Sequence, residues 1–316
     1  MPVSANERPF GDKVMGMEPS EYNVVFVTID SCTYDSASRA NTHNLLSLSP
    51  LRKAETHGSF TFPAHMSFFI GNLPNLIDGN TYYFERYSQI WRSVAARPSK
   101  HQTIAIPFRS KNILDYYHER NCYVLGVGGV SFFNIHRSYN SLPSLFPNFI
   151  YYGPKEYVPR EERIPRPPSD FPLNHLDEII QKLPQNKPFF LFVNSPTTHI
   201  PYDSPNLSAT REYKDAVLKA YIEHDNKVLY PVDRLPLTSY EINLLKNAQV
   251  LSLEWVDRQL GELFSNLPNR NRPTLIVVCS DHGEEFGEGG RFGHAHIHET
   301  VYTVPMWIGV LNSDKV

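Results

Sequence analysis

The sequence has little cysteine, no long hydrophobic run and no excess of charge of one sign. Its three cysteines, Cys32, Cys122 and Cys279, are widely spaced and form no CxxC pair, which argues against a disulfide framework and a zinc ribbon. No uninterrupted apolar run approaches the ~18 residues that span a bilayer. The first 22 residues lack the basic and apolar regions of a signal peptide. We therefore expect a soluble protein of a reducing compartment, and we assign it to the cytoplasm.

The charge balance is close to neutral. The chain has 30 Lys and Arg against 33 Asp and Glu, for a formal net charge of −3. No global basic field is present to attract nucleic acid or anionic lipid, so we expect a small-molecule substrate. The oligomeric state stays open, and a homo-oligomer is one option.

Short apolar runs alternate with helix-like segments along the chain. Continuous rather than alternating apolar runs are typical of central parallel strands that are covered on both faces. Six such runs are present: Asn23–Asp30, Gln102–Pro107, Cys122–Gly129, Pro188–Ser195, Pro273–Asp281 and Val304–Leu311. Helical patterns occupy Ser110–Arg120, Asn174–Pro184 and Ser239–Pro268. This order predicts an α/β fold, a doubly wound and mostly parallel sheet with helices on both faces. We expect a loose leader over residues 1–22 and a single catalytic domain over 23–316.

Two acidic residues end predicted strands. Asp30 ends the first strand, and Asp281 ends a later one and is followed by His282 and a glycine-rich turn. In a doubly wound sheet, ligands bind at the carboxyl ends of the strands, so both carboxylates could meet at one cation. Asp and His ligands suit zinc or manganese. Either Asp alone could equally be an ordinary loop or cap residue.

The segment Gly58–Gly71 contains a hydroxyl close to a predicted helix start. Pro63 is expected at the first helical position, which places Thr61 just upstream of the helix N-terminus. Backbone N–H groups and the helix dipole stabilise an anionic ester there. A metal can activate a threonine hydroxyl as a nucleophile. The alternative is that Thr61 only caps the helix.

Histidines occur in two further loops. His199 follows a buried strand, where it could donate a proton to a leaving oxygen, although a histidine without a role is also an option. His294, His296 and His298 alternate with other residues near the C-terminus. If this segment is extended, all three share one face and suit a metal or oxyanion site. If it is helical, only His294 and His298 face together.

In order, these segments resemble the alkaline phosphatase superfamily, and specifically its sulfatase-like branch with a Thr nucleophile. VVFVTIDSCTYDS is similar to the family's first strand with its metal-binding Asp, and TFPAHMSFFIG to its nucleophile motif. NSPTTHIPY resembles the loop whose His contacts the transferred group, and EWVDRQLGELFSNL a helix before the last core strands. SDHGEEFGEGGRFGH, followed by HETVYTVPMWIG, carries the Asp-His metal pair and the last strand. The resemblance spans residues 23 to about 309.

The sequence departs from the sulfatase pattern at three positions. Thr61 replaces the Cys or Ser that becomes formylglycine, which makes ordinary sulfate-ester hydrolysis doubtful and favours phosphoryl transfer. His65 replaces an anion-binding Arg, and Ser31 replaces a second Asp. The resemblance then implies a metal site of Asp30, Thr61, Asp281 and His282, holding Zn or Mn, with Ca or Mg as options. We favour one bound metal; a second site would draw on Asp225 or His224 together with His294, His296 or His298.

The resulting prediction is a metal-dependent hydrolase of a small-molecule phosphodiester, phosphomonoester or phosphonate ester, acting through a phospho-Thr61 intermediate. His199 or His294 would protonate the leaving oxygen, and His65 would share the charge of the transferred group. One alternative is a transferase that moves a phosphoryl head group to a soluble acceptor. The other is a metal-binding protein of the same fold without catalysis.

Overall fold

The computed structural model describes most of the sequence. The described residues are 16–71, 112–137, 140–154, 171–202, 204–205, 207–208, 210–226, 228–268 and 271–311. The strand predicted at Gln102–Pro107 lies outside them. All the candidate site residues named above lie within them.

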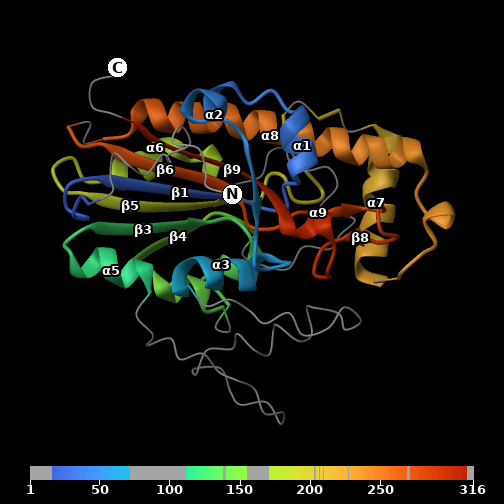
Figure 1. Ribbon diagram of the computed structural model, residues 1–316, viewed down its shortest axis with the longest axis horizontal. Coiled ribbons are helices and arrows are strands. Elements are labelled where there is room, and N and C mark those ends of the chain that lie inside the picture. The colour runs from blue at the N-terminus through green and yellow to red at the C-terminus, as the bar shows by residue number, and fades with distance from the viewer. Residues whose placement is uncertain are drawn as a thin grey trace, which may run out of the picture.

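A seven-stranded sheet runs through the described part of the molecule (Figure 1). Its order is β2 (Arg52–Glu55), β9 (Thr303–Leu311), β6 (Thr274–Ser280), β1 (Asn23–Ile29), β5 (Phe189–Ser195), β3 (Tyr123–Gly128) and β4 (Asn148–Tyr151). The five strands from β6 to β4 are mutually parallel. β9 is antiparallel to β6, and β2 is antiparallel to β9. The prediction of a mostly parallel α/β sheet is therefore confirmed.

Helices cover both faces of this sheet (Figure 1). One face carries α1 (Tyr34–Arg39), α2 (His43–Leu48), α6 (Leu176–Lys182) and α8 (Ser239–Asn266), and the other carries α3 (Thr61–Ile70) and α5 (Ile113–Glu119). α7 (Arg211–Asn226), α9 (Glu299–Tyr302) and a small sheet of β7 (Glu285–Phe286) and β8 (Phe292–Gly293) lie beyond the carboxyl ends of the parallel strands.

β1 shows why the central strands read as continuous apolar runs. Val25, Val27 and Ile29 pack into a core shared with α6 and α8, whereas Val24 and Phe26 pack into the core under α3 and α5. Successive side chains of a strand point to opposite faces, so a strand with helices on both sides must be apolar throughout.

Two strands of the seven-stranded sheet, and the two short strands β7 and β8, were not predicted. β2 has the polar, largely exposed sequence RKAE at the edge of the sheet. β4 forms the opposite edge, in an aromatic segment that the sequence analysis did not count among the strands. Edge strands are often short and less apolar, so the continuous apolar run that marks β1 and β5 is missing from β2 and β4.

Residues 16–22 lie against the domain: the Tyr22 and Tyr117 hydroxyls are 2.8 Å apart, and the Cys122 thiol donates to Pro19 O.

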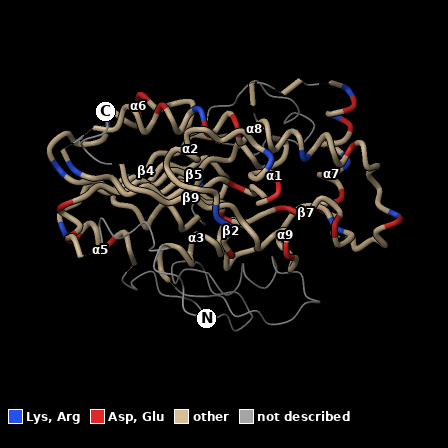
Figure 2. The backbone as a smooth tube through the Cα atoms, turned by 45° about the horizontal axis from the view of Figure 1, so that its top comes forward, with Lys and Arg blue, Asp and Glu red and all other residues tan. Residues whose placement is uncertain are grey.

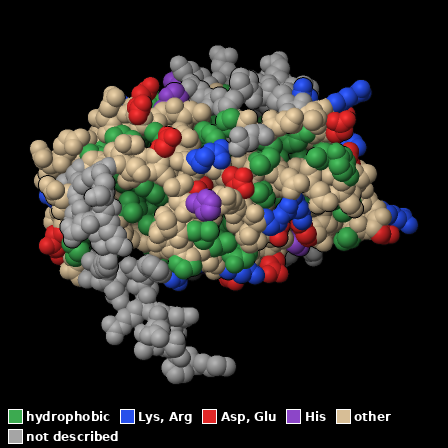
Figure 3. Space-filling view, turned by 90° about the horizontal axis from the view of Figure 1, so that it is seen from above, with side chains coloured by type: hydrophobic (Ala, Val, Ile, Leu, Met, Phe, Trp, Pro, Cys, Tyr) green, Lys and Arg blue, Asp and Glu red, His purple; other side chains and the backbone are tan. Residues whose placement is uncertain are grey.

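No described helix combines the length and hydropathy that a membrane crossing requires. Basic and acidic residues are interspersed along the backbone (Figure 2) and on the face seen from above (Figure 3).

The central strands should carry most of the stability of the domain. Leu191 of β5 is fully buried, so Leu191→Ala should lower the free energy of unfolding by about 2–5 kcal/mol through lost burial and a cavity. Leu46→Ala on α2, where the leucine is 50% exposed, is the matched control and should change it by less than about 0.5 kcal/mol. Urea denaturation measures both, and equal losses would contradict this assignment of the core.

Candidate metal centre and active site

The register of the parallel strands brings two carboxylates together. Ile29 of β1 lies opposite Ser280 of β6, so the next residues, Asp30 and Asp281, leave the same edge of the sheet side by side. Ser195 of β5 lies opposite Ile29 on the other side. The loops that carry Asp30, His199 and Asp281 therefore start from adjacent strand ends, where a doubly wound sheet binds its ligands.

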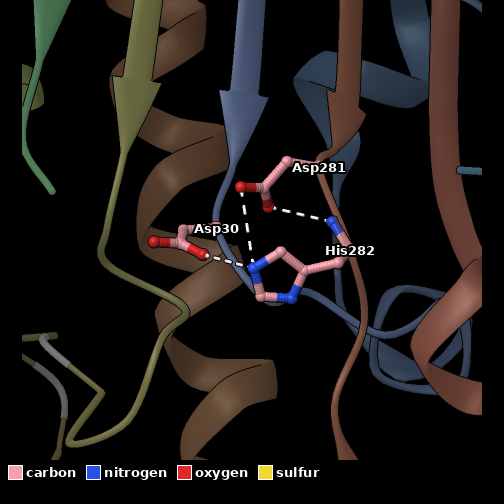
Figure 4. Close-up of side chains that lie close together, drawn as sticks. All are labelled: Asp30, Asp281 and His282. Atoms are coloured by element: carbon pink, nitrogen blue, oxygen red, sulfur yellow. Dashed lines mark hydrogen bonds and ion pairs between the residues drawn. The ribbon is translucent and has the colours of Figure 1, made fainter. Parts of the chain in front are cut away.

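Asp30, Asp281 and His282 form a compact buried group (Figure 4). His282 Nε2 lies 3.2 Å from Asp30 Oδ1 and 3.7 Å from Asp281 Oδ2. One ligand atom from each residue lies within 4.8 Å of the other two, and no other such group of three or more occurs among the described residues. These three residues could therefore hold a metal ion.

Hydrogen bonds orient these ligands and leave two atoms unpaired. Asp281 Oδ1 accepts from the backbone N–H groups of Ser31 and His282, at 3.3 and 2.9 Å. His282 Nδ1 lies 3.0 Å from Gly283 O and donates its proton to that carbonyl, so Nε2 is the nitrogen that presents a lone pair when the ring is neutral. Asp281 Oδ2 and His282 Nε2 are buried without a hydrogen-bond partner. Unpaired buried acceptors that face each other fit a cation.

The backbone beside Asp30 is strained in a way that serves this geometry. Ser31 has a φ of 61°, in the left-handed region that residues other than glycine seldom adopt. This conformation turns the Ser31 N–H toward the Asp281 carboxylate. Strain of this kind costs about 1–3 kcal/mol and persists only where the surroundings enforce it.

Burial shifts the pKa values of the charged groups. Burial raises the pKa of Asp281 to about 7. Burial acts to raise the pKa of Asp30 as well, but His199 and His282 outweigh it and hold that pKa below its usual value. For His282, burial is overcome by Asp281 and Asp30, which raise its pKa to about 9. The site thus concentrates negative charge that a cation would offset.

Thr61 lies in the first turn of α3 and is not its cap. The helix begins at Thr61, two residues earlier than predicted, and its N-cap is Phe60, which makes no side-chain capping bond. Pro63 is consequently the third helical residue, a position where its missing N–H also leaves no helical bond unmade. Thr61 is 4% exposed.

Hydrogen bonds connect the segment before Thr61 to the loop that carries Asp281 and to the loop that carries His294. Thr56 Oγ1 donates to the Asp281 carbonyl at 2.6 Å. The Ala295 N–H donates to Ser59 O at 2.7 Å. These bonds place the start of α3 between the Asp281 and His294 loops, where the N–H groups of its first turn are available to an anion.

His65 lies fully buried beside the site. Its Nδ1 is 2.7 Å from Thr61 O and 3.7 Å from Asp281 Oδ2, and its Nε2 is 2.9 Å from Thr28 Oγ1. Burial lowers its pKa to about 4, so the ring is neutral near pH 7.

Of His294, His296 and His298, only His294 has its ring against that of His282. The segment is neither a strand nor a helix, because Ala295 has a φ of 69° and turns the chain. The His294 ring lies 4.4 Å from that of His282 and 5.1 Å from that of His199, between centroids. His296 Nε2 instead lies 2.6 Å from Glu285 Oε2.

Of the remaining second-site candidates, only His224 lies close to His294. His298 caps α9 through Thr300 N, and Asp225 is exposed on α7. The His224 ring is 4.7 Å from that of His294, and its Nδ1 accepts from the His294 N–H. Among the described residues, these histidines and Asp225 do not form a group with the spacing of metal ligands.

Three residues near the site had not been singled out from the sequence. Buried Glu284 accepts a 2.9 Å hydrogen bond from the Tyr202 hydroxyl, and its Oε1 lies 3.6 Å from His294 Nδ1. Burial raises the pKa of Glu284 to about 7. On α8, Gln249 donates to Ser31 O and Thr198 O at 3.0 and 3.2 Å. The GEE run after His282 was the available signal for Glu284, whereas Gln249 gave none.

Comparison with known proteins identifies the chain. The family model for sulfatases matches residues 23–308, which is most of the sequence. The chain belongs to the sulfatase family. It shares the fold of the alkaline phosphatase superfamily. A search of curated proteins found none that matches.

Solved structures show the same fold at low sequence identity. The phosphonate monoester hydrolase SpPMH from Silicibacter pomeroyi is 14% identical with a TM-score of 0.56, and the match covers 93% of this chain and 68% of that one. The zinc-bound C-terminal periplasmic domain of EcEptC from Escherichia coli is 13% identical with a TM-score of 0.52, covering 93% and 74%. An alkaline phosphatase superfamily protein from Vibrio parahaemolyticus is 13% identical with a TM-score of 0.50, covering 93% and 61%.

The metal-binding assignment leads to a direct test. Asp281→Asn should weaken Zn²⁺ or Mn²⁺ binding by more than the roughly 10–100-fold typical of changes around the ligands, because it removes a ligating charge. Asp257→Asn is the control: this buried carboxylate only binds the Asn44 and Leu45 N–H groups, and its loss should leave metal affinity unchanged. Calorimetric titration measures both, and equal affinities for Asp281→Asn and wild type would refute the site.

The metal-free sulfatase-family chain should lose stability as the pH rises from 6.5 to 9. His282 is the main cause, because its folded pKa is raised from the ordinary 6.5 to about 9, so the folded protein holds this proton more tightly and loses that advantage across this range. Asp281 and Glu284, with folded pKa values raised to about 7, lose most of theirs at lower pH and add only a small further loss near pH 7. Metal binding should reverse the trend, because deprotonated ligands bind it. Melting temperatures with chelator and with metal test this, and a metal-free protein that melts no lower at pH 9 would contradict it.

Proposed function

We propose that this chain is a metal-dependent phosphoester hydrolase that forms a covalent phospho-Thr61 intermediate. The observation that carries the proposal is the pair of unpaired buried atoms, Asp281 Oδ2 and His282 Nε2, beside Asp30. Thr61 lies at the start of α3, which is fastened to the Asp281 loop. Threonine cannot form the formylglycine of sulfatases, which favours phosphoester over sulfate-ester chemistry.

The metal is proposed to be zinc or manganese, held by Asp30, Asp281 and His282 with the Thr61 hydroxyl as a fourth ligand. Two carboxylates and an imidazole are the oxygen and nitrogen donors that these ions accept. The zinc complex of EcEptC supports the choice of zinc. Bound there, the cation supplies positive charge that favours loss of the Thr61 proton and offsets charge on the phosphoryl oxygens.

In the first step, Thr61 Oγ1 forms a bond to phosphorus, and the bond from phosphorus to the leaving oxygen breaks. The N–H groups of the first turn of α3 face the transferred group and share its charge. A proton passes to the leaving oxygen from His199, or from His294 once the field of the bound phosphoryl group favours its charged form, since burial lowers the pKa of His294 well below its usual value. The centroids of the two rings are 5.1 Å apart, and the His294 ring lies 4.4 Å from that of His282.

In the second step, water attacks phosphorus from the opposite side, and Thr61 leaves with its oxygen. The same histidine accepts a proton from the water, which restores its starting state. Glu284, 3.6 Å from His294 Nδ1 and bound by Tyr202, keeps a carboxylate beside that ring. The name of SpPMH, a phosphonate monoester hydrolase, supports including phosphonate esters among the substrates to be tested.

Thr61→Ala should reduce turnover of bis-nitrophenyl phosphate by at least about 1,000-fold in metal-loaded protein, because the attacking oxygen is gone. Thr61→Ser should retain part of the activity and should form phosphoserine in a rapid-quench experiment. Nitrophenyl phosphate, a phosphonate ester and a sulfate ester complete the panel. Wild-type turnover by Thr61→Ala would exclude the covalent scheme.

Added glycerol separates hydrolysis from transfer. A hydrolase should release only the product of water attack, whereas a transferase should yield a phosphoryl-glycerol product that mass spectrometry detects. Complete absence of turnover with metal bound would favour a binding protein of this fold.

A further inference from the structure

His65 is held inside a closed hydrogen-bond network. Thr61 O can only accept, so His65 Nδ1 donates its proton there at 2.7 Å. The other nitrogen, Nε2, is then an acceptor and receives the Thr28 hydroxyl proton at 2.9 Å. Neither nitrogen keeps a proton for a substrate. The distance from Nδ1 to Asp281 Oδ2, 3.7 Å, is too long for a hydrogen bond.

The network continues across the sheet. Thr28 Oγ1 also accepts from Asn194 Nδ2 at 3.2 Å, and Asn194 Oδ1 accepts from the Val130 N–H at 3.3 Å. His65, Thr28 and Asn194 are each fully buried. A satisfied network of buried polar groups is rigid, because breaking any bond leaves an unpaired group without water.

Aromatic rings hold the imidazole in this orientation. The His65 ring packs against four phenylalanine rings, with centroid distances of 5.1 to 6.0 Å, from Phe68, Phe69, Phe133 and Phe192. The ring cannot turn toward the substrate side without displacing this packing, so its bonds to Thr61 and Thr28 are fixed by the core.

We propose that His65 is a positioning residue for Thr61, not a contact for the transferred anion. It ties the first residue of α3 to Thr28, which lies on β1 two residues before Asp30. The nucleophile and the first metal ligand are thereby held at a fixed separation by one imidazole. This inference rests on the proposed role of Thr61 and assigns how that residue is aligned.

Two substitutions at opposite ends of the bond test this. His65→Asn places an amide near the position of Nδ1 and loses the bond to Thr28, and Thr28→Val removes the hydroxyl while leaving α3 intact. Each should lower kcat for bis-nitrophenyl phosphate up to about 100-fold, because a misplacement of about 1 Å has that effect. KM should stay within about twofold, since substrate contacts are unchanged. The burst of phospho-enzyme should slow in parallel.

Ser67→Ala is the matched control. Ser67 lies on the same helix, is buried, and donates to Pro63 O at 2.9 Å, a bond of the same i to i−4 type that does not involve Thr61. It should leave kcat unchanged. Calorimetric Zn²⁺ or Mn²⁺ affinity should be the same in all three variants, which separates positioning from loss of the metal.

A double variant tests whether His65 and Thr28 act through the same hydrogen bond. If His65 and Thr28 act as one unit, His65→Asn with Thr28→Val should be no slower than the slower single variant. A raised KM with unchanged kcat in His65→Asn would show an anion contact, and unchanged kcat in Thr28→Val would break the proposed link; either result overturns the inference. Failure of the nucleophile assignment is distinct, because it appears as wild-type turnover by Thr61→Ala.

Discussion

The structure depends on bringing Asp30 and Asp281 out of water at neighbouring strand ends. Two carboxylates buried a few ångströms apart repel each other, and burial alone disfavours their charge. The protein offsets this with His282 and with backbone N–H groups, one of them from strained Ser31, yet Asp281 Oδ2 stays unpaired. A bound cation would offset the remaining negative charge of these carboxylates.

Much of the fold could be predicted because the central strands carry their own signal. β1, β5 and β6 are apolar on both faces and sit in the middle of the sheet. β2 and β4 lie at its edges, where pairing with a neighbour decides the structure and the local sequence does not. Helix α3 begins at Thr61, two residues before the start that was predicted at Pro63.

Candidate site residues that are adjacent in the sequence could be predicted, whereas contacts between residues far apart in the sequence were missed. Asp281 and His282 are adjacent in the sequence, and each follows from the end of one strand. Tyr202 and Glu284 are 82 residues apart, and only the finished fold shows that they share a hydrogen bond. The orientation of the His294 side chain depends on the backbone turn at Ala295, which neither an extended nor a helical pattern predicts. Long-range pairing and single backbone turns leave no periodicity to read.

Gln249 links two loops of the candidate site through a single atom. Its Nε2 donates to Ser31 O, after β1, and to Thr198 O, after β5, from within the 28-residue helix α8. Because one amide nitrogen binds both buried carbonyls, removal of this side chain would take a partner from both at once. The loops that carry Asp30 and His199 therefore share one anchor on α8.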